Sequence, residues 1–255
     1  MEHDLTPPDP WAALRAHTAA RIALGRSGAS LPTAEWLRFG VAHAQARDAV
    51  HQALDTDALA RGLQQHGFDS LVAESTAPDR ATFLQRPDLG RALSGRSRGL
   101  LQGLAATPVD VVCVVGDGLS ATAAQRHALP LLRDWRPLLE QAGLTLGPVV
   151  LARQCRVALG DEIGLALQAR LAVVLLGERP GLSSPDSLGA YLTFGPRPGR
   201  RDAERNCISN IRPEGLPPAE AARRLAWLCT AALQRGATGI RLKDESEPPP
   251  ALPAA

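Results

Sequence analysis

Hydrophobic positions along the first hundred residues recur at helical spacing. Asp9 and Pro10 form a helix-start signal, and a helix is predicted from there to Gly25, where the glycine ends it. The candidate inner face of this helix consists of Trp11, Leu14, Thr18 and Ile22. Three more helices are predicted after it: one capped by Thr33 that runs to residue 54, one over residues 57–65 and one after Pro87. Since no strand pattern occurs here, residues 1–105 are predicted to form a helical N-terminal region.

The pattern changes after this region to short runs rich in β-branched residues. Residues 109–115, VDVVCVV, lie between proline and glycine and are typical of a strand buried on both faces. Further strands are predicted at 148–151, 171–176 and 239–242, with helices at 121–142, 161–170 and 217–234. The alternation predicts an α/β fold over residues 106–245, with a doubly wound, mostly parallel, Rossmann-like sheet. The proline-rich residues 246–255 are predicted to be a disordered tail.

The composition excludes several classes of partner. With 45% hydrophobic residues in a chain of 255, the protein can bury a sizeable core. Its 28 basic and 26 acidic residues leave a net charge of +2, too little to attract nucleic acid or an anionic membrane. Aromatic residues are 4% of the chain, so base-stacking platforms are lacking. No segment approaches the ~20 apolar residues of a membrane span, and no secretory signal is recognised. We therefore expect a cytoplasmic protein that binds neither nucleic acid nor membranes.

The four cysteines, at positions 113, 155, 207 and 229, are widely spaced. They form no CxxC pair and have no histidine at zinc-finger spacing, so no metal site is predicted. Cys207 is a candidate nucleophile, but every histidine lies at or before His127. A Cys/His pair would therefore have to form between distant parts of the chain. We assign no catalytic residue.

Residues 116–121, GDGLSA, follow a predicted strand and precede a predicted helix. This is where the G-x-G-x-x-A fingerprint of dinucleotide-binding folds lies, so a stand-alone nicotinamide-dependent oxidoreductase is one alternative. Two features disfavour it: Asp117 would face the pyrophosphate, and no acidic residue follows the next strand near Arg153 to hold a ribose. We interpret the motif as a tight turn at the carboxyl edge of the sheet, where ligands of such folds bind.

Three other polar clusters have both a functional and a structural interpretation. Glu178 and Arg179 follow a predicted strand at the same edge, and form either part of a site or an ion pair on an exposed turn. Residues 205–210 lie in a long stretch with little predicted structure, and long ordered loops tend to be functional. The N-terminal arginines form either an anion-binding patch or solvated helix faces: Arg21, Arg26, Arg47, Arg80, Arg86 and Arg91. A non-enzymatic interaction module built on the helical N-terminus is a second alternative.

Segments spread in order along almost the whole chain resemble one protein family. They are TAARIALGRSG (18–28), LPT (31–33), HAQARDAV (43–50), RPDLGR (86–91), GDGLSA (116–121), RVALGDEIG (156–164), GERPGLSSPDSLGAYLTF (177–194), RNCISNIR (205–212) and GIRLKD (239–244). The segments GERPGLSSPDSLGAY and RNCISNIR are specific. Together they resemble the small subunit of ethanolamine ammonia-lyase.

The resemblance implies an adenosylcobalamin enzyme of ethanolamine degradation, which converts ethanolamine to acetaldehyde and ammonia by a radical mechanism. In that family the substrate site lies in a TIM-type barrel on a large subunit, and the cobalt-containing cofactor is held between the two chains of a hetero-oligomer. The small subunit's cofactor contacts fall here on Val157, Glu178 and Cys207. The resemblance thus implies that this chain completes the cobalamin site of a carbon–nitrogen lyase and is inactive alone. It leaves open whether the complex is enclosed in a bacterial microcompartment.

Overall fold

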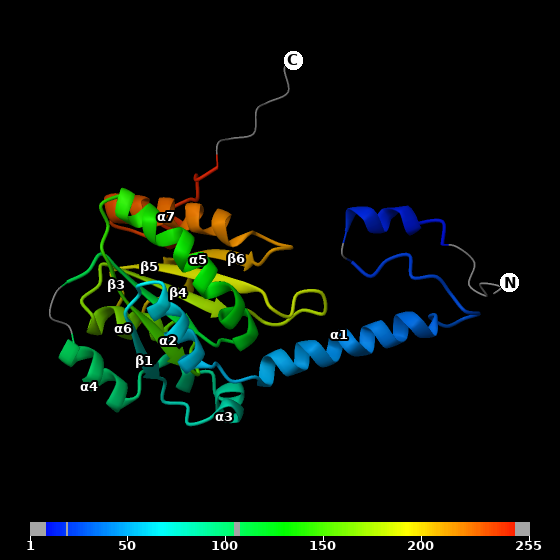
Figure 1. The fold of residues 1–255 in the computed structure, drawn as a ribbon, viewed down its shortest axis with the longest axis horizontal. Coiled ribbons are helices and arrows are strands. Elements are labelled where there is room, and N and C mark those ends of the chain that lie inside the picture. Colours follow the sequence, from blue (N-terminus) through cyan, green and yellow to red (C-terminus); the bar gives the residue numbers. More distant parts are fainter. Residues whose placement is uncertain (1–8, 19, 105–107, 248–255) are drawn as a thin grey trace, which may run out of the picture.

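The computed structural model describes residues 9–18, 20–104 and 108–247, and a six-stranded sheet forms its centre (Figure 1). The strands are β1 (Ser70–Glu74), β2 (Val111–Gly116), β3 (Leu146–Arg153), β4 (Leu171–Gly177), β5 (Leu188–Phe194) and β6 (Arg205–Ile211). Their order is β1-β3-β2-β4-β5-β6. The first four strands in this order pair in parallel, whereas β5 is antiparallel to both β4 and β6. The predicted α/β fold with a mostly parallel sheet is confirmed.

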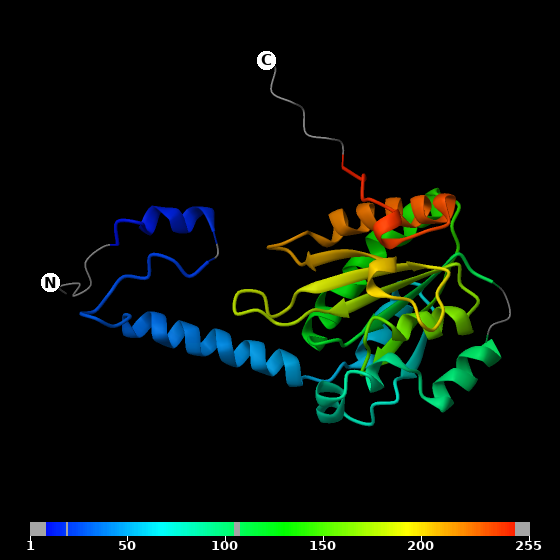
Figure 2. The same ribbon diagram turned by 180° about the vertical axis from the view of Figure 1, so that it is seen from behind.

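Helices cover both faces of the sheet because the central strands are apolar on both sides. In β2, Val111, Cys113 and Val115 face one hydrophobic cluster, and the two valines between them face the other. The first cluster is closed by α2 (Thr56–Gln65), α5 (Ala121–Gln141) and α7 (Pro218–Arg235), and the second by α4 (Gly95–Leu104) and α6 (Leu159–Ala166). Figure 2 shows the sheet from behind, with α7 and α4 on opposite sides. The sheet is therefore the middle of three layers.

Three strands were missed and one predicted strand is wrong. β1 lies within the region predicted to be wholly helical, and β5 and β6 lie in stretches that were given no strand. Residues 239–242 do not form a strand. Gly239–Arg241 is a 3-10 turn, in which Gly239 has φ +70° and donates its N–H to Asn206 Oδ1 at 2.8 Å. A side chain there would lie 2.0 Å from the Ala203 carbonyl oxygen, which explains the glycine.

The N-terminal segment forms an arm that projects from the sheet (Figures 1 and 2). The predicted helix from Asp9 to Gly25 is wrong: among the described residues of this stretch, 9–18 and 20–25, the one helix is a six-residue 3-10 helix, Ala12–His17. The second predicted helix is confirmed as α1 (Thr33–His51), but Thr33 does not cap it, because Pro32 occupies the cap position. The predicted boundary between residues 105 and 106 lies outside the described residues, as does the tail from residue 248.

Candidate functional site

A pocket of about 670 Å³ opens at the carboxyl ends of β2 and β4. From β2 the chain passes through α5 to β3 on one side, and from β3 it returns through α6 to β4 on the other side. The sheet order therefore reverses between β2 and β4, and in open α/β sheets such a switch point is where ligands bind. We call it the switch-point pocket. Its lining includes Arg91, Gly118, Arg156, Val157, Glu178 and Tyr191.

The GDGLSA turn after β2 is held inside the fold. The Asp117 side chain is 3% exposed, accepts N–H groups from Gln154 at 2.9 Å and Cys155 at 2.8 Å, and pairs with Arg80 at 3.1 Å. Burial raises the pKa of Asp117, against the lowering effect of these hydrogen bonds and of Arg80. Asp117 therefore faces inward and ties the turn after β2 to the turn after β3, in agreement with the interpretation of this motif as a tight turn.

The same turn is poorly suited to a dinucleotide. The Leu119 N–H donates to the Gly177 carbonyl at 2.9 Å and the Ser120 N–H to the Asp117 carbonyl at 3.1 Å. These two N–H groups are therefore not available to a pyrophosphate, which such turns bind through backbone N–H groups. At Gly118, where φ is +52°, a side chain would lie 2.2 Å from the Gly177 oxygen. The glycines bring the turn against the end of β4.

Glu178 is the first residue after β4 and is half-buried at the pocket. Its Oε2 accepts hydrogen bonds from Ser187 Oγ at 2.5 Å and from the Asn210 N–H at 3.2 Å. No ion pair with Arg179 is present among the described residues, so the alternative of an ion-paired surface turn is not what the structure contains. Neither of these bonds uses Oε1, which lies beside Gly189, where a Cβ would approach it to 2.9 Å. The carboxylate is fixed through one oxygen and retains acceptor capacity on the other.

Val157 and Cys207 lie at a second pocket of about 390 Å³ that adjoins the first. Val157, Tyr191 and Asp202 line both pockets, so the two share a wall. Val157 follows β3, while Cys207 lies on β6 and is the cross-strand neighbour of Tyr191. Cys207 is therefore on an edge strand and not in the irregular loop that we predicted. Val157 and Glu178 lie past strand ends at the carboxyl edge of the sheet, whereas Cys207 lies mid-strand, level with Tyr191 on β5 and Val174 on β4.

The two groups of the second pocket that could lose a proton to become nucleophiles, the Cys207 thiol and the Tyr191 phenol, are neutral. Burial raises the pKa of Cys207, and the nearby Glu178 carboxylate acts in the same direction. Burial also raises the pKa of Tyr191 well above its ordinary value. Within the described residues, the hydrogen-bonding neighbour of Cys207 Sγ is Ser209 Oγ at 3.5 Å, and no histidine is near enough to activate the thiol. The thiol and the phenol therefore remain protonated near neutral pH.

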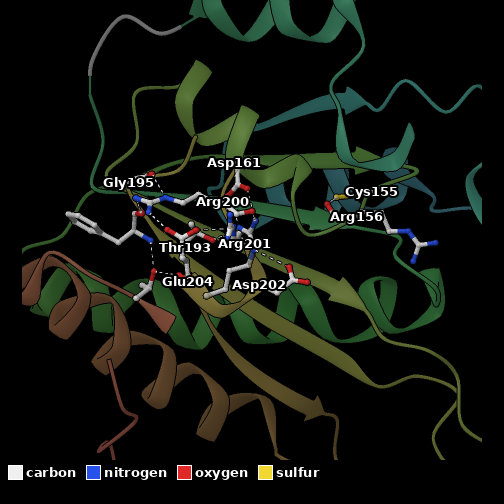
Figure 3. A network of polar contacts seen from close by, with 12 residues as sticks. Cys155, Arg156, Asp161, Thr193, Gly195, Arg200, Arg201, Asp202 and Glu204 are labelled. Atoms are coloured by element: carbon white, nitrogen blue, oxygen red, sulfur yellow. Dashed lines mark hydrogen bonds and ion pairs between the residues drawn. The ribbon is translucent and has the colours of Figure 1, made fainter. Parts of the chain in front are cut away.

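Arg205 on β6 and Asp161 on α6 form a buried ion pair beside the second pocket. Figure 3 shows Asp161 with Thr193 and Arg200, which also contact Arg205. Arg205 donates from both terminal nitrogens to the two carboxylate oxygens of Asp161 on α6, each at 2.7 Å. It also donates to Thr193 Oγ1 at 2.7 Å and to the Arg200 carbonyl at 3.0 Å. The loop with Arg200 and Asp202, which lines the switch-point pocket, is thereby fixed to α6. Sequence reasoning missed this network, because its partners lie 44 residues apart.

Five arginines line the switch-point pocket: Arg91, Arg156, Arg179, Arg200 and Arg201. The Arg156 guanidinium stacks on the Phe83 ring at 4.4 Å from the ring centre. Burial lowers the pKa of Arg156, and the charges of Arg80 and Arg91 lower it further. Arg91 was among the candidate anion-binding arginines, but Arg156 was not, since nothing local to its sequence marks it.

A family model and individual related sequences match almost the whole chain, and both belong to one family. Residues 8–243 match the family model described as "Ethanolamine ammonia-lyase light chain (EutC)". The chain belongs to the ethanolamine ammonia-lyase small-subunit family. It is 55% identical over 253 residues to the small subunit of Xanthomonas campestris, an alignment that covers 98% of this chain and 93% of the relative. It is also 55% identical to the small subunits of Pseudomonas putida, over 95% of this chain and 90% of the relative, and of Azotobacter vinelandii, over 94% and 90%.

Membership of the ethanolamine ammonia-lyase small-subunit family confirms the resemblance seen in the sequence and identifies the chain as a lyase subunit. Within residues 9–18, 20–104 and 108–247, no three His, Cys, Asp or Glu side chains cluster as metal ligands would. No helix in the same ranges is long and apolar enough to cross a membrane.

Proposed function

We propose that this chain is the small subunit of an adenosylcobalamin-dependent ethanolamine ammonia-lyase, and that its switch-point pocket and the adjoining pocket hold part of the cofactor. One observation carries the proposal. Val157, Glu178 and Cys207 come from three separate parts of the chain, and they line two adjoining pockets with a common wall. The family's cofactor contacts fall on these residues, and their convergence on adjoining pockets beside a ligand-binding edge in this chain supports the assignment.

The residues present fit cobalamin, whose periphery carries amide side chains and a nucleotide tail. Glu178 Oε1 can accept an amide N–H, and Val157 and Tyr191 offer apolar surface to the hydrocarbon parts of the ring. At the far end the buried Nε of Arg156 has no hydrogen-bond partner within the described chain. Cobalamin is much larger than a ligand that a pocket of about 670 Å³ encloses. This chain would therefore form one wall of the site, and a partner the other.

The proposed roles of this chain are to bind and orient the cofactor and to exclude water from it. When bound, the cofactor supplies the radical chemistry, which protein groups do not perform. Glu178 holds an amide, Val157 and Cys207 pack against the ring edge, and the Arg205 network keeps the wall in place. None of these groups is required to exchange a proton with ethanolamine. The substrate site and the conversion to acetaldehyde and ammonia are assigned to the large subunit.

The N-terminal arm supports a hetero-oligomer with that large subunit. On α1, Trp36 and Leu37 are each 63% exposed, and Phe39 and Val41 are also exposed. These four side chains are spread around more than half of the helix, and large apolar side chains exposed together on one helix favour an interaction site. The arm projects from the edge at which β4 ends (Figure 1), and Arg80 connects its last turn, through the Val50 carbonyl at 2.8 Å, to the GDGLSA turn. A partner seated over the pocket would meet the arm as well.

Co-expression with the candidate large subunit tests the function. We expect the two chains to co-purify and to form acetaldehyde from ethanolamine only when adenosylcobalamin is present. Each chain alone is the control and should be inactive. Replacing Trp36 and Leu37 together by serine should weaken co-purification without changing the folding of the α/β part. A complex that forms but produces no acetaldehyde with the cofactor would contradict the proposal.

A further inference from the structure

Arg91 and Arg156 line one end of the switch-point pocket and form no ion pair in the described structure. The nearby Asp117 carboxylate partly offsets the charge on Arg156, but it is itself paired with Arg80. The Arg156 guanidinium donates no hydrogen bond within the described residues, and its Nε is buried without a partner. Arg156 is only half-buried, so its terminal nitrogens remain available to an acceptor in the pocket, which points to a ligand.

The Arg156 side chain is held in place before any ligand arrives. Its guanidinium lies 4.4 Å from the centre of the Phe83 ring, and the Arg80 guanidinium lies 5.0 Å from the centre of the same ring. Its backbone N–H donates to the Gly90 carbonyl at 2.9 Å. A Cβ on Gly90 would lie 2.9 Å from Arg156 Cγ, so the backbone there packs directly on the arginine stem. Figure 3 shows Arg156 apart from Asp161 and Arg200 and directed away from them.

The charges at this end favour an anion. Arg80, Arg91 and Arg156 lie together, and within the described chain only Asp117 is paired with any of them. Their mutual repulsion and the burial of Arg156 are relieved if a negative group binds between them. Glu178 belongs to a different part of the pocket, where its carboxylate is fixed by Ser187 and Asn210. Arg179, Arg200 and Arg201 also line the pocket, and Arg200 is paired with Glu204. Arg91 and Arg156 differ from these three in lying beside Arg80, so that three guanidinium groups act on one another.

We propose that Arg156 and Arg91 form a phosphodiester site and that the phosphodiester is the one in the nucleotide tail of cobalamin. The inference rests on the proposed function. Cobalamin has neutral amides around its ring, and the phosphodiester is its ionised peripheral group. The planar fork of arginine matches phosphate oxygens geometrically. The pocket then orients the cofactor: the phosphate lies at the arginine end and the ring amides lie toward Glu178.

The test compares two cofactors that differ in this group. Adenosylcobinamide lacks the nucleotide and its phosphodiester, whereas adenosylcobalamin has both. In the assembled complex with the large subunit, Arg156→Gln should weaken adenosylcobalamin binding about ten- to a hundredfold and leave adenosylcobinamide binding unchanged. Arg91→Gln should act in the same direction and more weakly, because Arg91 is exposed. Binding is measured by equilibrium dialysis, independently of turnover. Arg96→Gln is the matched control, since Arg96 is exposed on α4 outside the pocket.

Each outcome decides the assignment. Equal weakening of both cofactors by Arg156→Gln would show that Arg156 supports the ring or the fold, and would overturn the proposal. Unchanged binding of adenosylcobalamin in both variants would overturn it too. If inorganic phosphate binds at these arginines without competing with adenosylcobalamin, the site takes a free phosphate and the assignment to the nucleotide is wrong. A wild-type complex that binds neither cofactor would overturn the proposed function itself, and this inference with it.

Discussion

Replacing Arg205 by methionine should destabilise the chain by about 3–5 kcal/mol near pH 7, because it removes one partner of a buried ion pair. The Arg205 and Asp161 side chains are 3% and 2% exposed, and two hydrogen bonds at 2.7 Å join them. Two charge-assisted bonds at about 1.5–3 kcal/mol each give a similar total. In the variant the Asp161 carboxylate has lost its cation, and it can limit the destabilisation by taking up a proton. Protonating a carboxylate with an ordinary pKa of about 3.9 costs about 4 kcal/mol at pH 7, which is the upper bound on the destabilisation.

This limit makes the destabilisation depend on pH. Burial raises the pKa of Asp161 in the wild type, against the lowering effect of Arg205, and removal of the cation raises it further in the variant. The loss is therefore absent below the wild-type folded pKa, which lies above the unfolded value of about 3.9, and grows as the pH rises above it, with a ceiling near 1.5 kcal/mol at pH 5. Urea unfolding of the full chain at pH 5 and pH 7, followed by tryptophan fluorescence, measures the difference.

Two controls separate this explanation from a general effect of mutation. Arg205→Met combined with Asp161→Leu removes both charges and should recover most of the stability. Arg86→Met breaks a pair whose side chains are 61% and 58% exposed, and should cost less than about 1 kcal/mol. A loss below about 1 kcal/mol for Arg205→Met, or a double variant no more stable than the single one, would refute the reasoning.

Four other outcomes are expected. In the assembled complex, Glu178→Ala should raise the half-saturating adenosylcobalamin concentration about ten- to a hundredfold and leave turnover at saturation intact, while an unchanged half-saturation point would remove Glu178 from the site. Because its pKa is raised, Cys207 in the isolated chain should react with iodoacetamide more slowly than free cysteine at pH 8, and faster reaction would show an activated thiolate. Cys207→Ser should remain active in the complex, and complete loss of turnover with the cofactor still bound would mean that the thiol takes part in the reaction. Gly118→Ala should lower the urea midpoint far more than Gly143→Ala, since both glycines have positive φ but a side chain at Gly143 meets nothing within 4 Å; similar midpoints would disprove the steric explanation.

Most elements predicted correctly are those whose sequence reflects burial on both faces or along a stripe; α1 is an exception, since only Ala42 and Ala49 are buried on it. β2 and β4 are continuous apolar runs because helices cover both sides of them, and α5 has a long amphipathic pattern. β1 and β6 could not be found in this way. They lie at the edges of the sheet, where exposed and half-exposed positions interrupt the run, and β6 reads RNCISNI.

The residues of the candidate site also differ in whether a local sequence pattern indicates them. Glu178 could be predicted because it directly follows a recognisable strand, and strand ends collect ligands. Arg156 could not, because its importance depends on Phe83 and on a missing acceptor, both of which are set by tertiary structure. The tight turn at residues 116–121 was predicted, but the hydrogen bonds of Asp117 could not be, because a turn sequence does not tell whether a side chain faces outward or folds back onto the next loop.

The hydrogen bonds of Asp117 have a consequence for the energetics of ligand binding. They join the loops after β2 and β3, and through Arg80 they reach α3 (Arg80–Gln85), so three segments under the pocket are fixed to one carboxylate. Ordering a flexible loop on association lowers affinity, and a floor that is already ordered avoids that loss. Entropy lost on binding should therefore come from the ligand and from the partner's side of the site, and the pocket floor should have the same backbone conformation before and after a ligand enters.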